Sequence, residues 1–306
     1  MSKKEKEEFQ YIDKPNIGLK RSAYIRKAVK LDNKDDQFSA KSFYKVRKSS
    51  TKSDVVDSFR RIGMCLNKIS FSTLPKANIS KVCFVTICNL DETNESYGVG
   101  PLNDAYLFAF IHYKLGYKVV FLYNPDKSRF VKSLKFFTAH TTSCLALYYS
   151  GPDSYSKISQ INHGILFNYN EYITDDEISI LVGQYGDAAL RVFVFQDGIC
   201  GGTIVNIKTA RSASKGNCPD IVTFTVSKND LTPKEKRLSH GIYTYYFCKL
   251  IRQFSESSVR RMAELLNMSM KRFGVSVTPT VSGDELLERS MIQGASTVFG
   301  ASAAPA

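Results

Sequence analysis

Short apolar runs that alternate with longer amphipathic stretches constrain the fold of this chain more than any other feature. Strands are predicted at residues 82–87, 117–123, 144–149, 191–195 and 221–226. Helices are predicted at residues 52–69, 102–115, 128–139, 175–184, 243–254 and 257–273. Strands that are apolar at nearly every position are buried on both faces, and helical connections between them favour parallel pairing. The sequence therefore predicts an α/β fold, with a mostly parallel sheet covered by helices on both faces.

The positive charge is concentrated near the N-terminus. The 306 residues carry a net charge of +13, but the first 80 hold 19 basic and 9 acidic side chains, a net of +10. Residues 1–50 mix Lys and Arg with isolated aromatic residues and show no apolar period, which predicts an extended basic arm. The expected organisation is an arm at 1–50, a helix and linker at 51–80, a globular domain at 81–290 and a flexible tail at 291–306.

Several classes of protein are disfavoured by composition. No apolar run approaches the roughly 20 residues that span a bilayer, and the charged start is unlike a secretory signal. The seven cysteines are scattered without a CxxC pair, and the four histidines show no zinc-ligand spacing. We therefore expect a cytoplasmic protein with reduced, mostly buried thiols, with no cofactor and no membrane partner.

Four segments carry a family resemblance. They are residues 98–105 (GVGPLNDA), 147–151 (LYYSG), 163–164 (HG) with 173–178 (ITDDEI), and 192–203 (VFVFQDGICGGT). Their order and spacing resemble caspase-like cysteine peptidases, and metacaspases more than animal caspases. Residues 241–244 (GIYT) and the Thr-Pro pair at 278–279 are similar to later family segments. The resemblance covers about residues 80–285 and implies a caspase-like three-layer sandwich.

The two catalytic positions implied by this resemblance hold the wrong residues. In the family a histidine follows Ser-Gly, and a cysteine near the end of a later strand attacks the peptide carbonyl; here these positions hold Pro152 and Ile199. Neither side chain can transfer a proton or act as a nucleophile. Cys200 stands one residue later, and such a shift on a strand end directs a side chain to the opposite face. The resemblance therefore implies a pseudo-peptidase.

An active enzyme remains the alternative. A gapped alignment would bring Cys200 to the nucleophile position, with His140 or His163 as its base. The chain would then be an atypical metacaspase-like cysteine peptidase that cuts beside Arg or Lys.

Two groups of acids also follow from the resemblance. Asp104 and Asp197 match the pair that holds a basic residue beside the cut, although each could instead cap a helix or a turn. Asp175 and Asp176 resemble part of a calcium site, but the third acid expected after the nucleophile turn is missing from residues 204–206. We therefore expect a remnant pocket for a basic residue and no bound metal.

The leading functional hypothesis is a non-catalytic, structural caspase-like scaffold that docks on an acidic macromolecular assembly. Microtubules are the favoured partner, which predicts a cytoskeletal location, on microtubules or in a flagellum. A regulatory pseudo-enzyme that pairs with an active metacaspase is a further alternative. Nucleic acid is a weaker candidate, because the body lacks a basic stripe and the first 80 residues carry nine acids. The docking residues are expected to be basic side chains of the arm: Lys20, Arg21, Arg26, Lys27, Lys45, Arg47 and Lys48.

Overall fold

The computed structural model describes most of the chain after the arm. The described residues are 52–74, 79–88, 100–151, 164–167, 171–197, 203–214, 216, 218–227, 233–254, 256–271 and 276–291. The predicted arm and the predicted tail beyond 291 lie outside them. Within these residues no helix is long and apolar enough to cross a membrane.

A mixed sheet forms the centre of the molecule, with the order β1-β3-β2-β4-β7-β8-β9 among the described residues. All neighbouring pairs are parallel except the last, in which β9 runs antiparallel to β8. The strands are β1 (Gly63–Cys65), β2 (Ile79–Ile87), β3 (Lys118–Tyr123), β4 (Thr141–Ser150), β7 (Arg191–Asp197), β8 (Asp220–Ser227) and β9 (Ser276–Val281). All five predicted strands are present, and the predicted mostly parallel sheet is confirmed.

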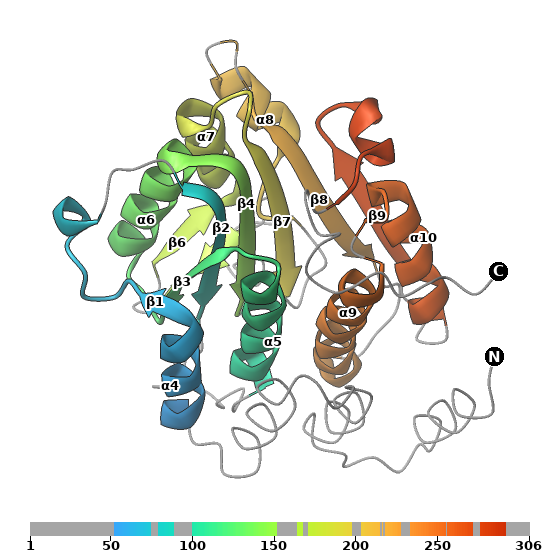
Figure 1. The fold of residues 1–306 in the computed structure, drawn as a ribbon, viewed down its shortest axis with the longest axis horizontal. Helices are drawn as coiled ribbons and strands as arrows, with labels where there is room; N and C mark the ends of the chain where they lie inside the picture. The colour runs from blue at the N-terminus through green and yellow to red at the C-terminus, as the bar shows by residue number, and fades with distance from the viewer. Residues whose placement is uncertain are drawn as a thin grey trace.

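Helices cover both faces of the sheet (Figure 1). One face carries α4 (Lys52–Ile62), α5 (Gly100–Lys114), α9 (Pro233–Gln253) and α10 (Val259–Met270). The other carries α6 (Lys127–His140), α7 (Asp175–Tyr185) and α8 (Ile207–Ala213). Successive strand residues enter opposite cores: Phe193 and Phe195 pack beneath α5 and α9, while Val192 and Val194 pack on the other side. The predicted three-layer α/β arrangement is confirmed.

The helix predicted at 52–69 is too long. It ends at Ile62, and the chain enters the sheet directly as β1, which pairs with β3. Gly63 permits this close approach, since an added Cβ would lie 2.5 Å from a methyl carbon of Val119. Phe59 of α4 is fully buried in the same core as residues of α5 and β3. Helix α4 therefore packs together with the globular domain that was expected to begin at residue 81.

Several short elements were not predicted. They are the antiparallel pair β5 (Gly164–Leu166) and β6 (Tyr172–Thr174), the helix α8, the strand β9, and the 3-10 turns at Phe71–Thr73 and Asp284–Glu288. The Thr-Pro pair at 278–279, which resembles a turn of the family, lies within β9. Helix α9 starts at Pro233, ten residues before the predicted start, and proline is favoured in the first turn of a helix.

Glycine and asparagine stand where a helix and a strand end. Gly116 follows α5 in the left-handed region at φ 79°, and Tyr117 N donates to His112 O at 3.0 Å, so a glycine caps this helix. Strand β3 ends before Asn124. The φ of Asn124 is 45°, a positive value that asparagine adopts more readily than most residues.

Candidate functional site

The carboxyl ends of three parallel strands meet at one edge of the sheet. Ile87 of β2 pairs with Ser150 of β4, and Ser150 pairs with Asp197 of β7. Figure 1 shows that α5 starts at this same edge. The segments that the family resemblance singled out therefore converge here, as expected for the carboxyl edge of a parallel sheet.

Backbone packing fixes the Ser-Gly pair that ends β4. Cys88 N donates to Ser150 O at 2.9 Å, which extends the pairing one residue beyond β2. An added Cβ on Gly151 would lie 2.7 Å from Cys88 O and 2.7 Å from the Tyr149 hydroxyl oxygen. Glycine is therefore required at 151.

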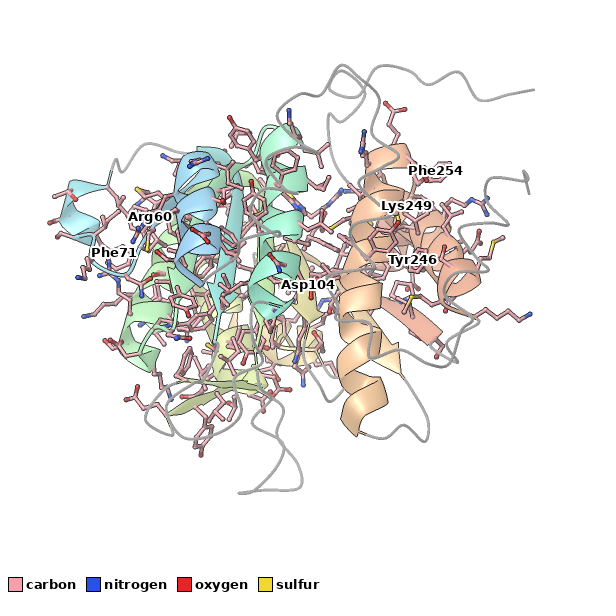
Figure 2. All side chains as sticks on the ribbon, turned by 90° about the horizontal axis from the view of Figure 1, so that it is seen from below. Arg60, Phe71, Asp104, Tyr246, Lys249 and Phe254 are labelled. Carbon is pink, nitrogen blue, oxygen red and sulfur yellow. The ribbon has the colours of Figure 1, made fainter. Side chains whose placement is uncertain are left out.

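Asp104 is a buried carboxylate beside this edge. Its side chain is 1% exposed, and it is the fifth residue of α5 (Gly100–Lys114), beyond the first turn, so it does not cap the helix. Figure 2 shows it on α5, with α9 as the neighbouring helix. A carboxylate removed from water needs compensating donors or a cation. The alternative of a simple helix cap is therefore wrong for Asp104.

Two buried amides at the same edge were missed by sequence reasoning. Both polar atoms of the Gln196 side chain and Oδ1 of Asn103 are buried without a hydrogen-bond partner among the described residues. Gln196 follows Val192 and Val194 in alternation, so it lies on the face opposite α5, away from Asp104. The available signal was a single polar residue at the end of the otherwise apolar β7.

His140 does not fit as a base for Cys200. It immediately precedes β4, at the amino edge, where its Nδ1 lies 2.8 Å from Phe136 O. The ten residues of β4 span about 33 Å. Three residues beyond Asp197 extend the chain by at most about 11 Å. The pairing of Cys200 with His140 is therefore excluded by the reach of the chain.

Three buried thiols of the sheet are poor candidates for a nucleophile. Burial raises the pKa of Cys83, of Cys144 and of Cys88, although hydrogen bonds from Tyr117 and from Tyr149 oppose the shift at Cys144 and Cys88 respectively. The Tyr117 hydroxyl donates to Cys144 Sγ at 3.2 Å, near the amino end of β4. Because the nucleophile is the thiolate, these protonated sulfurs behave as small apolar side chains.

The acids compared with a calcium site lie at the start of α7. Thr174 caps this helix in a capping box with Glu177, and Asp175 and Asp176 occupy its first turn. Asp176 Oδ1 accepts a hydrogen bond from Thr209 Oγ1 at 2.7 Å, which ties α7 to α8. Within the described residues no group of three or more His, Cys, Asp or Glu side chains could hold a metal. In this geometry Asp175 and Asp176 stabilise the start of α7, and Asp176 also connects it to α8.

The remaining predicted site positions lie outside the described residues. These are Pro152, His163, Ile199, Cys200, and the arm residues Lys20, Arg21, Arg26, Lys27, Lys45, Arg47 and Lys48. For Asp197 the structure describes the backbone, which ends β7.

The comparison that decides the family covers more than half of the chain. A family model described as the caspase domain matches residues 85–289. This chain belongs to the caspase domain family. The caspase domain is normally a peptidase domain. The match runs from the last residues of β2 to just beyond the 3-10 turn at Asp284–Glu288 and so includes the converging strand ends.

Other comparisons add little to this assignment. The Drosophila initiator caspase Dronc is similar in structure, with a TM-score of 0.47 and 10% sequence identity over 71% of this chain and 82% of that chain. No curated protein matches the sequence.

Proposed function

We propose that this chain is a non-catalytic caspase domain protein, a scaffold whose basic N-terminal arm docks on an acidic assembly, with microtubules as the favoured partner. The observation that carries the proposal is the register at the carboxyl edge. Ser150 pairs with Asp197, so the two strand ends that the resemblance links to catalysis are direct neighbours. In the sequence that follows them, the positions that the resemblance assigns to the catalytic pair hold Pro152 and Ile199.

The chemical consequence is a loss of both catalytic functions. Removing the nucleophile of a peptidase triad typically lowers turnover on the order of a millionfold. Proline offers no group that could protonate the leaving amine, and an isoleucine side chain has no lone pair. The exclusion of His140 as a base weakens the alternative in which Cys200 restores activity.

The buried carboxylate supports a binding role for the same edge. Asp104 lies beside the strand ends at 1% exposure, and a carboxylate in low dielectric binds a guanidinium or ammonium group strongly when hydrogen bonds also form. A remnant of a basic-residue pocket would let the body hold a Lys or Arg of a partner, or of its own arm.

The charge distribution supports docking by the arm. The first 80 residues carry +10 of the net +13. Clustered positive charge steers a protein onto an acidic surface and loses its effect as salt is added. Microtubules present a large, regular acidic surface in the cytoplasm.

Neutralising the arm is the first test. Changing Lys20, Arg21, Arg26, Lys27, Lys45, Arg47 and Lys48 to glutamine in the full chain is expected to weaken co-sedimentation with microtubules at least tenfold, since seven charge contacts of a few tenths of a kcal/mol each add to more than about 1.4 kcal/mol. The matched control changes four lysines and three arginines that are exposed and lie beyond residue 80: Lys118, Lys132, Lys208, Lys271, Arg211, Arg260 and Arg261.

The control variant is expected to bind as the unmodified chain does. Equal losses in the two variants would mean that net charge alone drives binding. Binding of the arm variant at full strength would remove the arm from the proposal.

A second test addresses catalysis. The full chain is expected to show no cleavage of Arg or Lys peptide substrates above background, and Cys200→Ala is expected to leave that background unchanged. Cleavage by the unmodified chain that disappears in Cys200→Ala would establish the atypical peptidase and overturn the non-catalytic assignment. The same preparation binding to microtubules would then show that docking and catalysis coexist.

A further inference from the structure

Two asparagine side chains form hydrogen bonds with both backbone groups of a strand residue, one toward each side of the sheet. At β9, Asn267 of α10 donates from Nδ2 to Val277 O at 2.7 Å and accepts from Val277 N at 2.7 Å. At β3, Asn67 donates to Tyr123 O at 2.6 Å and accepts from Tyr123 N at 3.0 Å. A neighbouring strand would bond to the same two groups of one residue. Each amide therefore takes the place of one residue of a neighbouring strand.

The pairing of β9 with β8 determines which of its groups point outward. Ser282 N donates to Ile221 O at 2.9 Å, so every second residue before Ser282 faces β8. The backbone groups of Val277, Pro279 and Val281 consequently point away from β8. In the part of the chain that the structure describes, β9 is the last strand on this side, and α10 runs beside it (Figure 1).

These outward groups are poorly suited to pairing. Both groups of Val277 are bonded to Asn267, and Pro279 has no N–H to donate. Of the six backbone groups that an ideal edge would offer at three residues, an incoming strand could use only the Pro279 carbonyl and the two groups of Val281. Proteins commonly protect exposed edges with proline, because such edges otherwise pair with other chains.

We propose that Asn267 and Pro279 close the β9 edge to strand addition, so that this domain does not pair there with a second copy or with an extended peptide. The inference rests on hydrogen bonds within the folded domain and is independent of whether the arm docks or the domain is catalytic.

The test compares full-length variants by sedimentation velocity from micromolar to submillimolar concentration. Asn267→Ala with Pro279→Val opens the edge, and Pro279→Val alone opens it while keeping every existing side-chain hydrogen bond. Adding Val281→Pro to the opened variant closes the edge again by a different residue. Far-ultraviolet circular dichroism confirms that each variant is folded. If the double variant does not fold, the single variant carries the test.

The opened variants are expected to self-associate at least tenfold more tightly than the unmodified chain, and the reclosed variant is expected to lose that gain. Failure of the folded opened variants to gain association would overturn the proposal. So would self-association of the unmodified chain that Val281→Pro abolishes. The unmodified chain could also self-associate in a way that Val281→Pro leaves unchanged. That self-association would use a surface other than the β9 edge, and a further gain in the opened variants would still support the proposal.

Discussion

Replacing Phe195 with alanine is expected to lower the free energy of unfolding by about 3–5 kcal/mol, the range for removing a fully buried phenylalanine ring. Phe195 is 0% exposed and is stacked on Tyr243 at 4.5 Å between ring centroids. The rings of Phe247 at 4.4 Å, Phe108 at 5.2 Å and Tyr148 at 5.6 Å surround it. These surrounding rings come from α5, α9 and β4, so no single element can move to fill the cavity.

The matched control is Phe254→Ala. Phe254 follows α9 and is 44% exposed, so its truncation is expected to change stability by less than about 1 kcal/mol. Urea unfolding of both variants, with the slope checked for two-state behaviour, measures the difference. Similar losses in the two variants would show that this aromatic cluster is not the main support of β7, and therefore not what fixes the strand end beside the candidate site.

The central strands could be predicted because their signal is local and repeated. Val192, Phe193, Val194 and Phe195 are apolar on both faces, and this pattern has few explanations other than a covered parallel strand. The cap at Gly116 was equally readable, since glycine supplies the left-handed conformation that ends a helix.

The edge elements could not be predicted, because distant residues determine them. Met64 and Leu66 happen to continue the helical apolar period of α4. Residues 63–65 form a strand because they pair with β3, which lies more than fifty residues later in the sequence. Pro279 indicates a turn in the sequence. It is accepted in β9 because its nitrogen points away from β8, which only the antiparallel register reveals.

The candidate site was predictable in its location and not in its environment. The resemblance singled out the segments around Ser150 and Asp197, and the structure pairs these two residues at the ends of neighbouring strands. The burial of Asp104 depends on the surroundings of α5, and α9, the neighbouring helix, starts more than a hundred residues later. No local pattern around Asp104 distinguishes a helix cap from a buried carboxylate.

Acidification is expected to destabilise the fold through one buried histidine. His112 is 1% exposed, its ring centroid lies 4.1 Å from that of Phe108, and burial lowers its pKa from 6.5 to about 4. Its Nδ1 lies 2.8 Å from Phe108 O and donates to it, which opposes the shift without cancelling it. Below pH 6.5 the unfolded chain takes up a proton that the folded chain resists until about pH 4.

The stabilisation from a neutral His112 is therefore complete above about pH 6.5 and is lost progressively as the pH falls to about 4. Each pKa unit corresponds to about 1.4 kcal/mol, so at about pH 5 the loss is about 2 kcal/mol. Acidic groups elsewhere also titrate, so the measured quantity is a difference between variants. His112→Phe, which cannot titrate, is expected to lose about 2 kcal/mol less than the unmodified chain between about pH 7 and about pH 5 in urea unfolding.

His140→Phe serves as the control for this comparison. His140 lies half-buried at the end of α6, with its ring stacked on Phe136 at 4.3 Å, so the same chemical change is made outside the core. Measuring this variant beside His112→Phe separates the effect of the core histidine from that of the substitution itself. If His112→Phe keeps the pH dependence of the unmodified chain, His112 is not the group that resists protonation, and the acid sensitivity of the fold arises among its carboxylates instead. If His112→Phe alone flattens the profile, the contact of His112 with Phe108 and Tyr117 is a pH-sensitive support of the helix layer that covers the candidate site.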